Sequence, residues 1–340
     1  MDKIQIVSFL LTRRCDLKCE YCRISKDYNY PLEYKNLQYF NSNEITTKET
    51  LQTLSKLKLH NKDIFIILYG GEITLRKDLS EIIGHCHKEN INYTIISNMT
   101  PRSKKVIDSL IQDHGYLQGL TSSIDPIDFE ENNINQFKKT QYGLEFVKYR
   151  DKVKDLVAEI TVSNSNLKNL YGLVKKLTEL GINSDITFLD ISKTNYYDFS
   201  DITDPKFLVN KDSKVKDILN NIIDSKLNVH MRDVLLLKIY DILPSELNCK
   251  IEEDIHNITI DSDGSIRLCL RIAGIQTPLK FNVSNFMDDN GNLNKDLKSS
   301  LSEDKKNLCK SCGWTCMIMS SLIAKYEGNI SELLHTEIRK

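Results

Sequence analysis

The sequence predicts an α/β fold in which strands alternate with helices. Apolar runs of strand length recur six times over the first 190 residues, and segments with helical spacing separate them. Because a strand, a helix and a second strand in succession normally form a right-handed parallel crossover, these strands should run parallel in a sheet. The expected strands are Ile4–Leu11, Ile64–Leu68, Tyr93–Ser97, Leu120–Ile124, Leu156–Val162 and Ile186–Leu189.

Apolar periodicity and capping signals define the helices between these strands. The first expected helix follows possible N-caps at Ser42 and Asn43. Pro101 suits the first turn of a helix, and Gly181 suits the residue just after one. The expected helices are 44–59, 78–90, 101–114, 136–149 and 166–180.

Three histidines and one cysteine lie on or beside these helices. His85, His87 and His114 are expected to be solvated or to cap helix ends. Cys86, between the first two, is expected to be a buried structural thiol, because its helix runs back from the carboxyl ends of the strands.

Composition and charge exclude several classes of protein. The 340 residues carry 46 Lys and Arg against 47 Asp and Glu, a net charge of −1, which gives no electrostatic case for a nucleic-acid or membrane partner. The longest apolar run near the start is too short to span a bilayer and lacks a signal-peptide cleavage site. Nine cysteines, an odd number, argue against a disulfide framework and for a cytoplasmic protein that uses thiolates to bind metal.

Cys15, Cys19 and Cys22 lie within eight residues, directly after the first apolar strand. Thiolate clusters select zinc or iron–sulfur, and zinc sites usually present two Cys pairs or a pair with histidines. Three thiolates on a 4Fe–4S cluster would leave one iron with an open site. Basic neighbours should favour an anionic cluster and lower the thiol pKa values. These neighbours are Arg13, Arg14, Lys18 and Arg23.

The spacing Cys15-x3-Cys19-x-Tyr21-Cys22 resembles the cluster motif of the radical S-adenosylmethionine enzymes. The resemblance implies that S-adenosylmethionine chelates the open iron and that one electron, from a donor such as flavodoxin or ferredoxin, cleaves its C5′–S bond. The resulting 5′-deoxyadenosyl radical would take a hydrogen from a carbon of the substrate. Protein groups would hold the cofactor and exclude water.

A second motif supports the resemblance. Gly70-Gly71-Glu72 follows the apolar run 64–68 and resembles the family's Gly-Gly-Glu motif, which binds the methionine amino group. The two glycines would let the backbone approach a ligand closely. Ile73 stands where the family usually has Pro, a mild departure.

The family's fold and further site residues follow from the same resemblance. It implies a partial (β/α)6 TIM-like barrel over residues 1–190, with the chemistry at the carboxyl ends of the strands. A helical bridge over 191–248 would lead to a small iron–sulfur module over 249–340. Polar side chains at the ends of strands three to five would reach the cofactor, although such residues are also ordinary turn and capping residues. The candidates are Ser97, Ser123, Asp125 and Ser163.

The C-terminal part predicts a hairpin around Asp263 and Gly264. A three-residue loop over 262–264, with Gly264 left-handed, segregates the two faces of the hairpin better than a two-residue loop. It places Ile258, Ile260, Ile266 and Leu268 on one face, opposite Thr259, Arg267 and Cys269.

Five cysteines surround this hairpin and resemble the auxiliary-cluster modules called SPASM and, in shortened form, twitch. One auxiliary 4Fe–4S cluster needs four thiolates, so one of the five cysteines is spare. The same thiolates would bind a structural zinc ion equally well, and this alternative stays open. Cys309 and Cys312 are favoured over Cys316 as ligands, and Cys316 is the candidate for a hydrogen donor to a substrate radical. The five are Cys249, Cys269, Cys309, Cys312 and Cys316.

The substrate remains open between a small molecule and a peptide. Auxiliary-cluster enzymes include peptide maturases, dehydrogenases of sugar or cyclitol alcohols, and enzymes that activate other proteins. Because the first ligand is residue 15, no leader-binding domain is expected ahead of the core, which shifts weight towards a small substrate or a peptide recognised by the C-terminal region. A non-catalytic iron–sulfur or zinc protein is the alternative of another class.

Overall fold

The computed structural model describes two compact units of the chain. The described residues are 3–19, 22, 37–125, 144–188, 213–229, 255–268 and 281–308. The first unit comprises Met1–Ser97, Arg102–Leu120 and Lys250–Cys309, and the second comprises Asn98–Pro101, Thr121–Cys249 and Lys310–Lys340.

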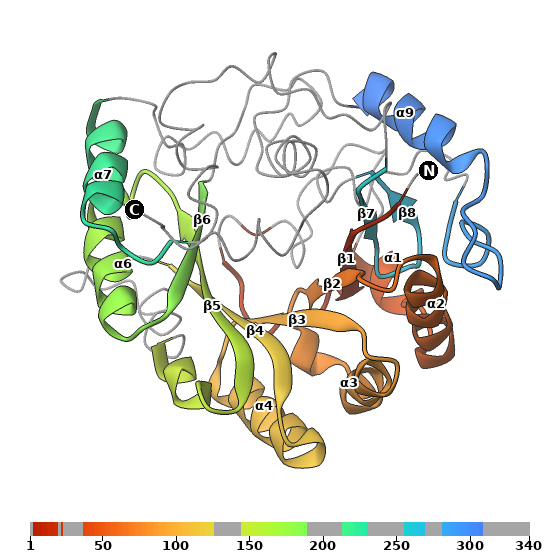
Figure 1. Ribbon diagram of the computed structural model, residues 1–340, viewed down its shortest axis with the longest axis horizontal. Helices are drawn as coiled ribbons and strands as arrows, with labels where there is room; N and C mark the ends of the chain where they lie inside the picture. Colours follow the sequence, from red (N-terminus) through yellow and green to blue (C-terminus); the bar gives the residue numbers. More distant parts are fainter. Residues whose placement is uncertain are drawn as a thin grey trace. The chain divides into compact units, whose positions relative to one another are not determined.

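The first unit is built on a mostly parallel sheet with the strand order β3-β2-β1-β7-β8 (Figure 1). Strand β1 pairs in parallel with β2 on one side and with β7 on the other, while β7 and β8 are antiparallel. Both faces of β1 are largely buried, as its nearly continuous apolar sequence requires. The strands are β1 (Ile6–Thr12), β2 (Phe65–Gly70), β3 (Asn92–Ser97), β7 (Asn257–Ile260) and β8 (Ile266–Arg267).

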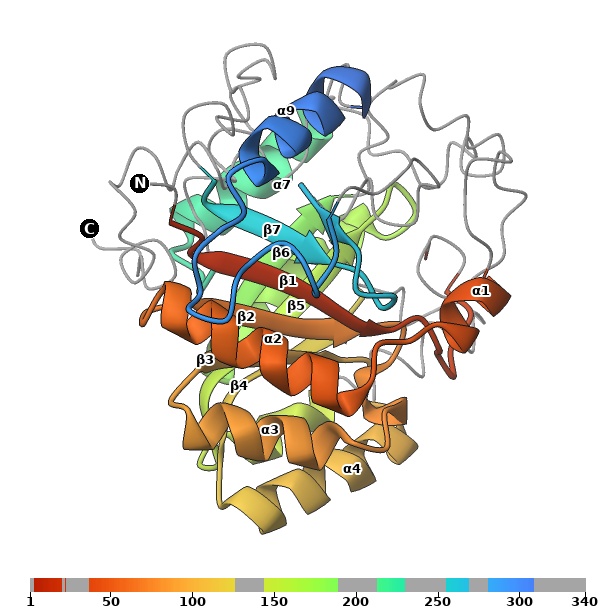
Figure 2. The ribbon, with the colours of Figure 1, turned by 90° about the vertical axis from the view of Figure 1, so that its right-hand side faces the viewer.

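Helices α2 and α3 cover the same face of β1, β2 and β3 (Figures 1 and 2). A capping box starts α2, with the Thr46 hydroxyl accepting from the Glu49 N–H and the Glu49 carboxylate accepting from the Thr46 N–H. The caps expected at Ser42 and Asn43 are therefore wrong. The helices of this unit are α1 (Leu37–Ser42), α2 (Thr47–His60), α3 (Leu79–Lys88), α4 (Pro101–His114) and α9 (Leu297–Leu308), and the 3-10 turn η1 spans Ile73–Leu75.

The second unit contains a parallel pair of strands and the helices that follow them. Strands β5 (Val153–Val162) and β6 (Asn183–Phe188) pair in register from Val157 and Asn183 onwards. Gly181 has a φ of +67°, which suits the left-handed residue that ends a helix. The other elements are η2 (Glu145–Tyr149), η3 (Leu167–Asn169), α6 (Leu170–Glu179) and α7 (Ser213–Asp224), and β4 (Leu117–Ile124) runs from the first unit into the second.

All six predicted strands are present, and their ends coincide with the prediction or differ from it by up to three residues. The helices predicted over 44–59, 78–90, 101–114 and 166–180 are confirmed, whereas 136–149 is described only from residue 144 and there forms the 3-10 turn η2. The hairpin prediction is also confirmed, because Thr259 pairs with Arg267, Ile260 pairs with Ile266, and Gly264 has a φ of +80°.

The parallel pairing of β7 with β1 was not predicted, because the hairpin was assigned to a separate C-terminal module. The register joins Ile6 to Asn257 and Phe9 to Ile260. The hairpin therefore extends the sheet of the first unit and buries the edge of β1 that β2 leaves uncovered.

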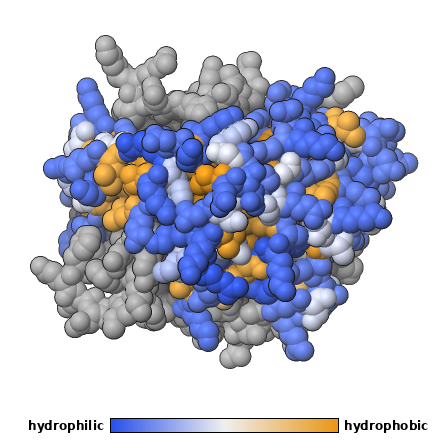
Figure 3. Space-filling view, turned by 90° about the horizontal axis from the view of Figure 1, so that it is seen from below, coloured by the Kyte–Doolittle hydropathy of each residue, from blue (hydrophilic) through white to orange (hydrophobic). Residues whose placement is uncertain are grey.

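Other expectations remain predictions. The boundaries near 190 and 248 lie outside the described residues, and closure of the strands into a partial barrel is not established. Among the described residues, no helix is long and apolar enough to cross a membrane. The described part of the face drawn in Figure 3 is mainly hydrophilic, with apolar side chains in small separate groups.

Candidate iron–sulfur and cofactor site

The three cysteines of the first motif lie in one segment that leaves the carboxyl end of β1. The strand ends at Thr12, and Cys15 follows after two arginines. Among the described residues, Cys15, Cys19 and Cys22 form no disulfide, and each is of intermediate exposure. The Cys22 N–H donates to the Cys19 carbonyl over 3.1 Å, and the Leu17 N–H lies 3.4 Å from Cys15 Sγ. Local backbone turns therefore bring these thiols into one short loop.

The Gly-Gly-Glu segment docks on the start of this loop through the backbone. The Gly71 N–H donates to the Thr12 carbonyl over 2.8 Å, and the Glu72 N–H donates to the Arg14 carbonyl over 2.7 Å. A Cβ added at Gly70 would lie 2.3 Å from the Thr12 carbonyl oxygen, and one at Gly71 would lie 2.4 Å from the Arg14 carbonyl oxygen. Only glycine fits at these two positions, so the two motifs are joined directly by main-chain contacts.

The close approach that requires these glycines is thus to the cysteine segment itself. Their approach to a ligand, which was the sequence-based expectation, stays a prediction.

Glu72 is a buried carboxylate at the end of β2, with 1% of its surface exposed. Its Oε1 accepts hydrogen bonds from the Thr74 N–H over 3.1 Å, the Thr74 hydroxyl over 2.7 Å and the Ser97 hydroxyl over 3.0 Å. Three donors on one oxygen fix the carboxylate and lower the cost of burying its charge. Ser97, from the end of β3, therefore acts on Glu72, and its direct contact with a cofactor stays a prediction.

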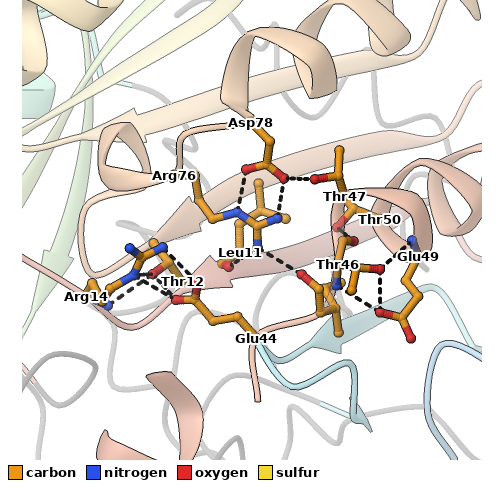
Figure 4. Close-up of polar contacts among 11 residues, drawn as sticks. Leu11, Thr12, Arg14, Glu44, Thr46, Thr47, Glu49, Thr50, Arg76 and Asp78 are labelled. Atoms are coloured by element: carbon orange, nitrogen blue, oxygen red, sulfur yellow. Dashed lines mark hydrogen bonds and ion pairs between the residues drawn. The ribbon is translucent and has the colours of Figure 1, made fainter. Parts of the chain in front are cut away.

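The arginines before Cys15 are both paired with carboxylates. Arg14 Nη2 lies 2.8 Å from Glu44 Oε2, and the Thr12 hydroxyl donates to Glu44 Oε1 (Figure 4). Arg13 forms a buried pair with Asp261 at 2.7 Å. Both positive charges are therefore paired with carboxylates.

Burial raises the pKa of Cys15 to about 12, and the Leu17 N–H offsets only part of this effect. Cys22, Glu72 and Asp16 add smaller increases to the same pKa. The expectation that basic neighbours lower the thiol pKa is wrong for Cys15. Metal loading must therefore displace a proton from this thiol.

Arg76 joins the end of β1 to the helices behind the site. Its guanidinium donates to the Leu11 carbonyl over 2.9 Å and forms a two-bond pair with Asp78, whose Oδ2 also accepts from the Thr47 hydroxyl (Figure 4). Although burial opposes it, the hydrogen bonds from Arg76 and Thr47 and the Arg76 charge hold the pKa of Asp78 below its usual value. This network fixes the start of α3 against β1 and α2.

The remaining described candidates belong to the second unit. Ser123 is half-buried on β4, and Asp125, just after this strand, is 1% exposed. Ser163 follows β5, where its N–H donates to Asn166 Oδ1 over 2.8 Å and its hydroxyl lies 2.8 Å from that of Ser165. These bonds are typical of a turn, so cofactor contacts of Ser123, Asp125 and Ser163 stay predictions.

The five C-terminal cysteines lie outside the described residues. They are Cys249, Cys269, Cys309, Cys312 and Cys316. The roles assigned to them stay predictions.

The donor set of the first motif fits a cluster better than a single metal ion. Within the described ranges, no three His, Cys, Asp or Glu side chains converge on a common point that could hold one ion. In a 4Fe–4S cluster, however, each thiolate binds a different iron, so the thiols need not converge. Three neighbouring thiols beside a buried carboxylate match a cluster with one iron left for a ligand.

A family model matches the part of the chain that contains these residues. Residues 9–126 match the model of the radical SAM superfamily. This part of the chain is therefore similar to a radical SAM domain. Its matched range includes the three cysteines, the Gly-Gly-Glu segment and the ends of β3 and β4.

The curated relatives of this chain are distant, and the chain covers only part of each. The chain is 24% identical over 172 residues to the Fe-coproporphyrin III synthase of Methanosarcina barkeri. This match covers 46% of this chain and 40% of the synthase. The chain is 25% identical over 215 residues to the GTP 3′,8-cyclase of Aquifex aeolicus, with 61% and 63% covered. The chain thus spans less than two thirds of either relative.

Solved structures show the same fold. Streptococcus suis SuiB bound to S-adenosylmethionine has a TM-score of 0.57, and SuiB bound to the precursor peptide SuiA has a TM-score of 0.58. Each comparison covers 88% of this chain and 65% of the other at 14% identity, so the likeness extends to the fold alone.

Proposed function

We propose that this chain is a radical S-adenosylmethionine enzyme that abstracts a hydrogen from a carbon of its substrate. The observation that carries the proposal is the backbone junction between the two motifs. It holds Glu72 beside the segment with Cys15, Cys19 and Cys22, through the 2.7 Å bond from the Glu72 N–H to the Arg14 carbonyl.

Each group of the site has a definite task. Cys15, Cys19 and Cys22 would hold three irons of a 4Fe–4S cluster as thiolates, and the buried Glu72 carboxylate would pair with the ammonium group of the methionine part. A bound cluster with S-adenosylmethionine would supply radical chemistry, through one-electron cleavage of the C5′–S bond to a 5′-deoxyadenosyl radical. Thr74 and Ser97 keep Glu72 oriented, because both hydroxyls donate to its Oε1.

Burial of Glu72 strengthens this recognition. A charge-assisted hydrogen bond in a site that excludes water is stronger than one at the surface. The carboxylate is already fixed by three donors before a ligand arrives, so little orientational freedom is lost on binding.

An auxiliary 4Fe–4S cluster belongs to the proposal. Cys249 and Cys269 with Cys309 and Cys312 would hold it, with Cys316 as the alternate ligand or the hydrogen donor. Such a cluster could accept the electron left after hydrogen abstraction, which would give a net oxidation. Coupling and epimerisation are the other outcomes that the sequence permits.

The substrate is a small molecule or a peptide. The curated relatives are named for a coproporphyrin and for GTP, whereas a structure with the same fold was solved with a precursor peptide. At these identities neither observation selects the class. A flavodoxin or ferredoxin in the cytoplasm would supply the electron.

Anaerobic reconstitution of wild type and of a Cys15/Cys19/Cys22→Ala triple variant tests the proposal. Wild type should form 5′-deoxyadenosine from S-adenosylmethionine with dithionite, and the triple variant should form none while it retains the auxiliary iron. Cys86→Ala is the matched control, because that thiol is fully buried in α3. Metal binding by wild type without 5′-deoxyadenosine would instead identify a non-catalytic iron–sulfur or zinc protein.

A further inference from the structure

Arg13 forms a buried, two-bond ion pair with a residue of the C-terminal hairpin. Its Nε lies 3.1 Å from Asp261 Oδ1 and its Nη2 lies 2.7 Å from Asp261 Oδ2. Arg13 is 7% exposed and Asp261 is completely buried. The two residues are 248 positions apart in the sequence, so the pair joins the start of the cysteine segment to the loop between β7 and β8.

The same guanidinium also contacts the helix that follows the cysteine segment. Arg13 Cζ lies 3.9 Å from the ring centroid of Phe40, a buried residue of α1. A guanidinium over an aromatic face gains cation–π attraction as well as packing. Because residue 13 comes just before Cys15 and α1 comes after Cys22, one side chain holds both flanks of the segment that carries the three thiols.

Asp261 is itself held rigidly by its hairpin. Its Oδ1 accepts from the Ser262 N–H over 2.7 Å, and its carbonyl accepts from the Gly264 N–H over 2.8 Å. The Ile45 N–H donates to the Ser262 carbonyl over 2.8 Å, and a Cβ on Gly264 would lie 2.7 Å from Ile45 Cγ2. The hairpin loop is therefore fixed on the segment between α1 and α2 and offers Asp261 as a stationary partner.

Stability alone does not account for such a pair. Desolvation of two charges offsets most of their attraction, and apolar replacement of a buried ion pair is often neutral or stabilising. A planar two-bond geometry does, however, specify where the guanidinium lies. The main effect of the Arg13–Asp261 pair is therefore to fix the position of the Arg13 guanidinium.

We propose that Arg13 is a positioning residue for the iron–sulfur centre, held by Asp261 and Phe40 so that Cys15, Cys19 and Cys22 keep their arrangement. Its action on the bound cluster rests on the proposed function, whereas its action on the loop does not. Asp261 also balances the Arg13 charge, so the pair adds no net charge beside the cluster.

The first experiment uses the metal-free full chain and needs no assumption about function. Alkylation by iodoacetamide, followed by peptide mass spectrometry, measures the reactivity of the three thiols one by one. Arg13→Met combined with Asp261→Leu removes the pair without leaving a buried charge, and urea unfolding checks that the variant is folded. We expect faster alkylation in this double variant than in wild type. Lys56→Gln is the matched control, because it breaks an ion pair of α2 with Asp289 outside the cysteine segment.

The second experiment uses the reconstituted protein. Loss of groups that orient metal ligands typically weakens metal binding about ten- to a hundredfold, so the double variant should lose iron to a chelator correspondingly faster. Asp261→Asn leaves the Arg13 charge unbalanced, so it should move the reduction potential of the cluster to a more positive value, an effect that packing alone would not produce. If Asp261→Asn does not fold, the double variant decides.

Two results separate the inference from the proposed function. A folded double variant with wild-type alkylation rates and wild-type iron retention would overturn the role of Arg13, whatever the activity. A wild-type protein that forms no cluster on the three cysteines would overturn the proposed function, and the alkylation rates would still decide the role of Arg13 in the loop.

Discussion

The two ends of the strands in the first unit hold very different groups. At the carboxyl ends, charged side chains are buried or nearly so and make two or more hydrogen bonds each: Glu72, the Arg13–Asp261 pair and the Arg76–Asp78 pair. At the amino ends of β3 and β4, aromatic and imidazole rings pack together. The amino-end cluster consists of His87, Tyr93, His114 and Tyr116.

The amino-end cluster is held together by ring stacking and by hydrogen bonds. His87 stacks on Tyr116 with ring centroids 4.6 Å apart, and its Nε2 lies 2.8 Å from the Tyr93 hydroxyl. Burial raises the pKa of Tyr93, which keeps the phenol neutral. His114 lies 3.0 Å from the Ser80 carbonyl, and His85 lies 2.9 Å from the Ser55 hydroxyl. The histidines thus make tertiary contacts, so the expectation of solvated or capping side chains is wrong.

The comparison of the two ends shows where this chain buries charged side chains despite the free-energy cost of removing them from water. The amino-end cluster stabilises its end of the strands with ring packing and hydrogen bonds. Buried charges need paired partners to be tolerated, and they occur at the end of the strands that carries both sequence motifs. Changes at the two ends should therefore separate stability from cofactor binding.

Gly71→Ala should have the largest effect and should affect both properties. A Cβ would lie 2.4 Å from the Arg14 carbonyl oxygen and 2.6 Å from that of Arg13, so the two segments must part. Overpacking of this kind costs about 1–3 kcal/mol in the free energy of unfolding. Iron loading at the three cysteines should fall as well, as measured by iron analysis after reconstitution.

Gly172→Ala is the matched control for that change. Gly172 lies in α6 with nothing within 4 Å of an added Cβ, so alanine should raise the free energy of unfolding by about 0.5–1 kcal/mol. Equal, mild effects of the two substitutions would contradict the close docking of the motifs.

His87→Ala should affect stability alone. Loss of one hydrogen bond and one ring stack should lower the free energy of unfolding by about 1–2 kcal/mol, measured by urea titration. S-adenosylmethionine affinity should stay at the wild-type value. Lys88→Ala, an exposed neighbour on α3, controls for the helix, and weakened cofactor binding in the His87 variant alone would break the contrast between the two ends.

Asp78→Asn should have the smallest effect, and it should depend on pH. The folded chain holds the pKa of Asp78 below the ordinary 3.8, so the stabilisation is complete above that pH and is lost as the pH falls through the folded value. We expect a loss of about 1 kcal/mol at neutral pH, because asparagine removes the charge but keeps an acceptor oxygen for Arg76 or Thr47. Unfolding curves of variant and wild type should converge in acid, and a constant difference over the whole pH range would count against the ion pair.

The parts predicted from sequence are those with local causes. Apolar runs predict the strands. The position of Gly181 after a helix and that of Gly264 in a hairpin predict a left-handed backbone at each glycine, and both are left-handed in the structure. The cysteine motif and the Gly-Gly-Glu motif could be recognised in the sequence because the residues of each motif lie close together along the chain. The start of α2 could also have been found, since Thr46-x-x-Glu49 is the signature of a capping box.

The parts missed depend on partners distant in the sequence. Asp261 gives no local sign that it will hold Arg13, and no pattern pairs β7 with β1. The Cys15 pKa was predicted in the wrong direction because burial of the thiol raises it, while Arg13 and Arg14 pair with carboxylates, and only the folded chain shows either effect. Thr74 could have been noticed as a hydroxyl two residues after a carboxylate, the spacing of a side-chain turn.

The affinity of Glu72→Gln for S-adenosylmethionine tests the central claim most directly, namely that the Gly-Gly-Glu segment and the cysteine segment form one cofactor site. Glutamine keeps an acceptor oxygen for Thr74 and Ser97 and removes only the negative charge, so the fold and the iron content should stay unchanged. A hydrogen bond to a charged group contributes about 1.5–3 kcal/mol, so binding to the reconstituted protein should weaken about ten- to a hundredfold. Wild-type affinity in this variant, with iron intact, would contradict the account.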